Sequence, residues 1–155
     1  MTMIPLSLES LQEYLSGKEL GPETQKETNQ LVVILKIKEK EFPLFFRIFE
    51  EGNLLQMLVF IPTSIKNASL NDTARLLHLI NKELDIPGFG IEEDNKIIFY
   101  RLMIPAPSKK VDVKVIEMLL SSLEKICETF TPIIHAVATQ NITFEEVLKR
   151  AKNAK

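Results

Sequence analysis

The sequence predicts an α+β domain in which an antiparallel five-stranded sheet packs with helices, in the order α-β-β-β-α-β-β-α-α. Two observations predict this class. Three consecutive segments of strand length are rich in β-branched, aromatic and aliphatic residues, and short polar turns join them as antiparallel hairpins require. Elsewhere the apolar residues recur every three or four positions, which is the period of an amphipathic helix.

Length and composition indicate one soluble domain spanning residues 1–155. A content of 45% hydrophobic and 26% charged residues is typical of globular proteins of this size. The net charge is −2, and the 19 basic residues are interspersed among 21 acidic ones, so no basic field is available for nucleic acid. The apolar segments are too short to span a membrane, no export signal is evident, and the single Cys127 suits a reducing compartment. We therefore expect a cytoplasmic protein without membrane or nucleic-acid partners.

The first half of the chain is expected to hold one helix and a three-stranded meander. The helix is predicted from leucines at helical spacing after Ser7, a residue type that caps helix N-termini. The polar residues 18–29 are expected to form a connection. The predicted strands are 30–38, 42–49 and 54–61.

The second half is expected to add a helix, a hairpin and two more helices. Ser69 and Asp72 form a predicted capping box for a helix that ends before Pro87. An acidic turn at 92–96 then leads into a strong strand at 97–104. A long helix follows from 111 to 137, which Pro132 should kink or divide. Thr143 and Glu146 predict the cap of a last helix.

No residue pattern predicts catalysis, a metal site or a cofactor. Gly88 and Gly90 lie between a helix and a strand, whereas nucleotide-binding loops follow a strand and open a helix. Instead, these glycines are expected to allow backbone angles that other residues avoid, in a joint that returns Phe89 to the core. The histidines lack partners at ligand spacing, and Cys127 lies on an apolar helix face, where burial disfavours the thiolate. We therefore predict a protein that is not an enzyme.

The strands are apolar on both faces, although a half-solvated strand should alternate apolar and polar residues. This doubling occurs in 30–38, 54–61 and 97–104. Either helices cover both faces, or one face is an apolar patch that binds a partner or a second subunit. The residues predicted for such a patch are Val32, Ile34, Phe45, Phe49, Leu55, Met57 and Val59.

Several short segments resemble the bacterial YbjN family and the related type III secretion chaperone-like fold. They are Leu76-Leu-His-Leu-Ile-Asn-Lys-Glu-Leu84, Gly88-Phe89 before the acidic turn, Glu128-Thr-Phe-Thr-Pro132, and Glu51-Gly-Asn-Leu-Leu-Gln56. The resemblance covers about residues 6–140, and 141–155 form an extra C-terminal helix outside the common pattern.

The resemblance implies a non-enzymatic, homodimeric domain that binds a protein partner. Such a protein acts as a secretion chaperone that holds a secreted effector, or as a regulatory adaptor. Chaperones of this fold bind extended segments along apolar grooves and sheet edges. The alternative is a small-ligand-binding protein or an enzyme with a cavity between sheet and helices.

Overall fold

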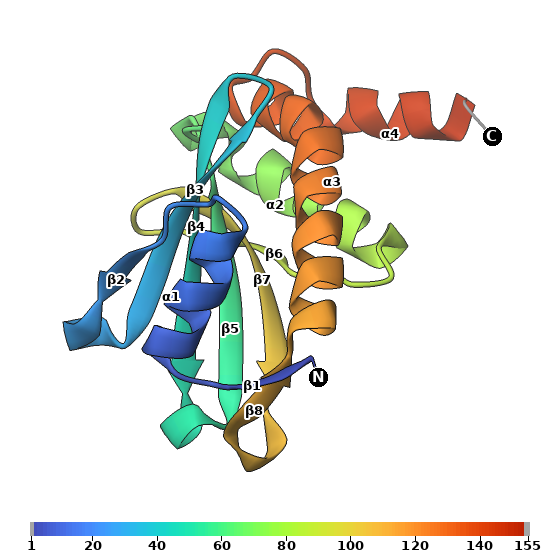
Figure 1. Ribbon diagram of the computed structural model, residues 1–155. Helices are drawn as coiled ribbons and strands as arrows, with labels where there is room; N and C mark the ends of the chain where they lie inside the picture. Colours follow the sequence, from blue (N-terminus) through green and yellow to red (C-terminus); the bar gives the residue numbers. More distant parts are fainter. Residues whose placement is uncertain (1, 154–155) are drawn as a thin grey trace.

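The protein is described by a computed structural model that covers residues 2–153 (Figure 1). It confirms the α+β class. The strands are β1 (Met3–Pro5), β2 (Glu23–Gln25), β3 (Gln30–Ile37), β4 (Lys40–Phe49), β5 (Leu54–Ile61), β6 (Phe89–Glu92), β7 (Ile97–Pro105) and β8 (Lys110–Asp112). The helices are α1 (Leu8–Gly17), α2 (Leu70–Glu83), α3 (Val113–Ala138) and α4 (Phe144–Asn153).

The main sheet has six strands rather than the five expected from the sequence. Its order is β2-β3-β4-β5-β7-β6, and every neighbouring pair is antiparallel. The sixth strand, β2, lies within the polar residues 18–29 that were expected to be a connection. It has only three residues and no apolar alternation, so its sequence carries no strand signal. A separate two-stranded ribbon pairs β1 with β8, so β1 lies beside the start of α3.

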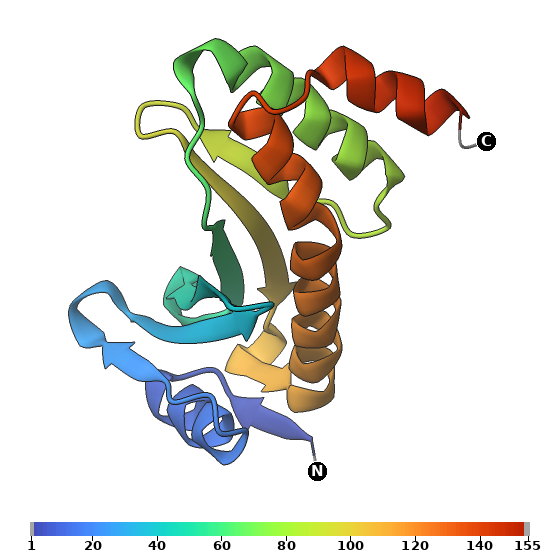
Figure 2. The ribbon, with the colours of Figure 1, turned by 90° about the horizontal axis from the view of Figure 1, so that it is seen from above.

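The core lies between one face of the main sheet and the helices. Figure 2 shows α1, α2 and α3 on the same side of the curved sheet. We call this side the helix-covered face. Its side chains on the four long strands include many that are at most 4% exposed, among them Leu31, Val33, Leu35, Phe42, Leu44, Phe46, Leu55, Met57, Val59, Ile98 and Tyr100.

The helix ends are tied by side chains, not always as predicted. Ser7 Oγ accepts a hydrogen bond from Ser10 N at 3.2 Å, which confirms the first cap. The predicted box at Ser69 and Asp72 is wrong, because Ser69 makes no side-chain capping bond. Asp72 Oδ2 instead accepts from Phe144 N at 3.0 Å, which joins the start of α4 to α2. The local capping rule predicted that the Asp72 carboxylate would serve its own helix, α2. It instead binds the backbone of Phe144, which is 72 positions away in the sequence.

The long helix α3 continues through Pro132 and is not divided there. Figure 2 shows that α3 bends toward its C-terminal end, as expected for a proline that removes one backbone donor inside a helix. The side chains that it buries include Ile116, Leu123, Cys127 and Ile134.

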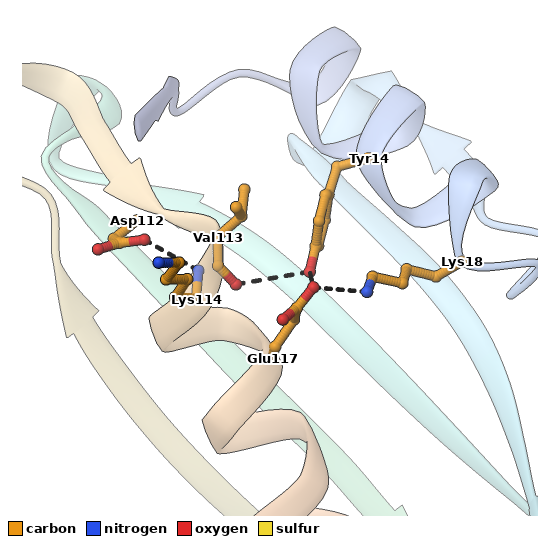
Figure 3. Close-up of polar contacts among 6 residues, drawn as sticks. All are labelled: Tyr14, Lys18, Asp112, Val113, Lys114 and Glu117. Atoms are coloured by element: carbon orange, nitrogen blue, oxygen red, sulfur yellow. Dashed lines mark hydrogen bonds and ion pairs between the residues drawn. The ribbon is translucent and has the colours of Figure 1, made fainter. Parts of the chain in front are cut away.

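A polar brace fastens α1 to the first turns of α3 (Figure 3). Glu117 Oε1 accepts from the Tyr14 hydroxyl at 3.0 Å and forms an ion pair with Lys18 Nζ. Hydrogen bonds from Lys18 and Tyr14 lower the pKa of Glu117, while burial and the bond to Glu117 raise the pKa of Tyr14 above its usual range. The carboxylate is thus held ionised and the phenol neutral, which suits a structural contact rather than proton transfer.

Candidate functional site

The opposite side of the six-stranded sheet, which we call the open face, carries apolar side chains without a cover. Among residues 2–153, no helix crosses this side (Figures 1 and 2). Strand register places twelve apolar residues here, all half-buried or exposed: Val32, Ile34, Pro43, Phe45, Phe49, Leu54, Leu58, Phe60, Ile97, Phe99, Met103 and Pro105. A contiguous apolar surface shared by several strands is typical of a binding site.

The centre of the open face is a continuous apolar patch across neighbouring strands. Val32, Phe45 and Leu58 stand directly opposite one another on β3, β4 and β5. The rings of Phe45 and Phe60 meet edge to face with centroids 5.6 Å apart. Phe60 in turn stands opposite Phe99 on β7, so the patch spans four strands.

The seven residues predicted for the patch divide between the two faces. Val32, Ile34, Phe45 and Phe49 lie on the open face, and Ile34 is 44% exposed. The remaining three, Leu55, Met57 and Val59, are completely buried on the helix-covered face, so their assignment to an exposed patch is corrected. Because β5 is apolar at nearly every position, its sequence does not show which alternate residues face outward. Leu54, Leu58 and Phe60 take the outward positions.

A polar row crosses the open face beside the apolar patch, and no pattern in the sequence predicts it. Gln30, Arg47 and Gln56 stand directly opposite one another on β3, β4 and β5. The Arg47 guanidinium lies 5.1 Å from the centre of the Phe49 ring, and its Nε is buried without an acceptor. Gln56 is 7% exposed, and its Oε1 is buried without a donor.

The patch runs into a groove at the end of the sheet that holds the β6–β7 turn. The groove has a volume of about 740 Å³. Pro43, Phe60 and Ile97 belong to both the open face and the groove, and Pro62 extends the apolar lining. His135 also lines the groove, and its Nδ1 lies 2.7 Å from the Thr63 hydroxyl.

A second hollow lies between the β3–β4 hairpin and α3, where the alternative function placed a cavity. Its volume is about 160 Å³, and Ile37, Phe42, Cys127 and Thr131 contribute to its lining. Ligand pockets usually measure roughly 300–1,000 Å³, so this hollow is small for a metabolite.

Cys127 is expected to be inert toward thiol reagents while the protein is folded. Burial, with the nearby Glu124 carboxylate, raises the pKa of its thiol to about 12, so almost no thiolate exists at about pH 8. A chromogenic disulfide reagent should label the native chain only as fast as it unfolds. The same chain in urea is the control and should react at once. Stoichiometric labelling of the native protein within seconds would contradict the burial of Cys127.

The part of the chain that the structure describes holds no cluster of histidine, cysteine or acidic side chains suited to a metal ion. Within residues 2–153, no helix is both long and apolar enough to cross a membrane.

The fold and the open face define a class: an α+β domain with helices on one side of its sheet and an apolar, uncovered surface on the other. Within that class the chain belongs to the YbjN family. Its family model, described as "Putative bacterial sensory transduction regulator", matches residues 7–136. The match ends before α4.

A solved structure has the same fold. The crystal structure of YbjN from E. coli, described as "a putative transcription regulator", superposes with a TM-score of 0.62 at 12% sequence identity. The similarity covers 86% of this chain and 93% of that one. No curated protein sequence matches the chain.

Proposed function

We propose that this protein is a non-enzymatic regulatory adaptor that binds another protein through the open face of its sheet. One observation carries the proposal: twelve apolar side chains occupy a sheet face over which the described chain places no helix. Leaving this area in water is unfavourable, and docking a partner would remove it from water.

The chemistry of the face favours a protein over the other partner classes. Phenylalanine and methionine are enriched in protein interfaces, because their side chains give a large and adaptable contact area. The rim of the open face carries residues of both charge signs, since Lys36 stands directly opposite Glu41. It therefore offers no basic stripe for phosphates. The family's description as a regulator agrees with a role that needs binding and no chemistry.

The proposal is tested by affinity capture with a single substitution on the open face. The tagged parent should recover a protein from native lysate, and the purified protein should then bind the purified parent. Phe45→Asp should abolish both results, because it places a charge at the centre of the patch. Phe45 is half-buried, so circular dichroism should show that the variant stays folded.

Met118→Asp is the matched control. Met118 lies on α3 and is 58% exposed, so the same kind of change is made at an exposed apolar residue away from the open face. This variant should bind like the parent. If both variants fail to bind the partner, or if both still bind it, the result would count against the open face as the binding surface. Light scattering separates a further possibility: a dimer of the parent that Phe45→Asp converts to monomer would mean that the face binds a second copy of the chain.

A further inference from the structure

We propose that the partner segment on the open face carries a carboxylate that binds Arg47, between apolar residues that contact the central patch. This inference rests on the proposed function and adds the chemistry of the partner. It makes Arg47 the residue that selects an acidic segment over one that is only apolar.

The surroundings of Arg47 leave its charge without a counter-ion. Both of its directly opposite neighbours are neutral amides, Gln30 on β3 and Gln56 on β5. The ion pairs found among residues 2–153 lie elsewhere: Lys18–Glu117, Lys38–Glu128, Arg75–Glu145 and Lys82–Glu83. A guanidinium that a docking partner covers is costly unless an anion accompanies it, because burial of an unpaired charge loses hydration without compensation.

Arg101 repeats this arrangement on β7. Its guanidinium lies 5.7 Å from the centre of the Phe99 ring, and its cross-strand neighbours are Leu58 and Gly88. Both arginines therefore rest on phenylalanine rings of their own strands, which holds them against the sheet. Lys36 at the rim differs, because it stands directly opposite a carboxylate, Glu41. The two basic residues without a directly opposite carboxylate, Arg47 and Arg101, lie in the interior of the face, where a partner would exclude water.

The adjacent amide leaves Arg47 as the group of the polar row for a partner to bind. Gln56 Nε2 donates to Met103 Sδ at 3.5 Å, and Gln56 Oε1 is buried out of reach of a docked segment. The Arg47 side chain is only half-buried and forms no ion pair with the residues that the structure describes. The carboxylate of an aspartate or glutamate in the partner segment would accept from its guanidinium.

A second copy of this chain fits less well through the same face. Its open-face carboxylates stand at the margins: Glu23 on the edge strand β2, Glu92 on the edge strand β6, and Glu41 at the hairpin end of β4. Arg47 lies on an inner strand. Two open faces packed together would therefore bring arginines and phenylalanines, rather than carboxylates, to the centre.

The test uses a library of random-sequence peptides displayed on phage and selected on the purified full chain. Peptides that bind the parent but not Phe45→Asp are open-face ligands. These peptides should be enriched in aspartate or glutamate flanked by aromatic and aliphatic residues. One of them is then synthesised with its acidic residue and with the matching amide, and both forms are titrated against each variant.

Arg47→Gln should weaken the acidic peptide about 10- to 100-fold, as expected when a charge-assisted hydrogen bond is lost. Replacing the peptide carboxylate by its amide should weaken binding to the parent by the same factor. The amide peptide and the acidic peptide should bind the Arg47→Gln variant about equally, because the two substitutions remove the same interaction. Lys36→Gln removes the same charge from the same face and should change the affinity by less than about twofold.

The outcomes separate this inference from the proposed function. Open-face peptides without acidic residues, or an acidic peptide indifferent to Arg47→Gln, would overturn the inference and leave the proposed function standing. Selection of no peptide that depends on Phe45 would overturn both, as would a parent dimer abolished by Phe45→Asp, since a second copy would then be the occupant.

Discussion

Gly88→Ala should lower the free energy of unfolding by at least the roughly 1–3 kcal/mol that overpacking a core costs. A Cβ added at Gly88 would lie 2.2 Å from the carbonyl oxygen of Arg101. The obstacle is backbone, and it is held in place because Arg101 N donates to Gly88 O at 3.0 Å. Relief would need β6 to separate from β7. Urea unfolding followed by circular dichroism measures the loss.

Gly90→Ala is the control for this prediction, two residues further along the chain and inside β6. Its Cβ would lie 2.7 Å from the tip of the Phe99 ring. That ring is a half-buried side chain on the open face, so it can rotate aside. We expect the variant to lose clearly less stability than Gly88→Ala. Equal losses would show that the contact with the Arg101 carbonyl does not explain why residue 88 is glycine.

The two glycines show where reasoning from residue type succeeded and where it failed. The sequence correctly placed a joint between α2 and β7, and Phe89 returns to the core as predicted, with 7% exposure. The expected reason was wrong. The glycines in the left-handed region are Gly21 and Gly52, while Gly88 and Gly90 have no such angle and are required by close neighbours. A close approach depends on the strand pairing, which the order of residues does not reveal.

The dependence on strand pairing also explains which other elements could be predicted from the sequence. Long segments with a regular period were placed within a few residues, as for β5 (Leu54–Ile61) and α2 (Leu70–Glu83), because their own side chains define the element. The three-residue strands β1, β2 and β8 were missed, since pairing rather than composition makes them strands. The apolar doubling correctly raised the question of an uncovered face. Arg47 and Gln56 escaped notice because their importance lies in what surrounds them on other strands.

Asn81→Ala should cost about 2 kcal/mol or more, since it leaves several partly buried backbone groups without partners at roughly 1–3 kcal/mol each. Asn81 Oδ1 accepts from Phe89 N at 3.0 Å and from Gly88 N at 3.3 Å, and Nδ2 donates to Phe89 O at 3.0 Å. Faster hydrogen exchange at the Phe89 amide should accompany the lower stability in urea. Asn71→Ala, an exposed position in the same helix, is the control and should change stability by less than about 0.5 kcal/mol.

Asn81 also gives the family resemblance a physical meaning. The segments that carry it are far apart in sequence, yet the structure brings Asn81, Gly88, Phe89 and Phe130 to one joint. The Phe89 ring packs edge to face on Tyr100 at 5.0 Å and on Phe130 at 6.4 Å, and the Tyr100 hydroxyl donates to the carbonyl of Ile86. These residues fix α2, β6, β7 and α3 against one another, which holds the sheet in shape from its helix-covered side. If Asn81→Ala weakened binding at the open face without lowering stability, this structural reading of the motif would be wrong.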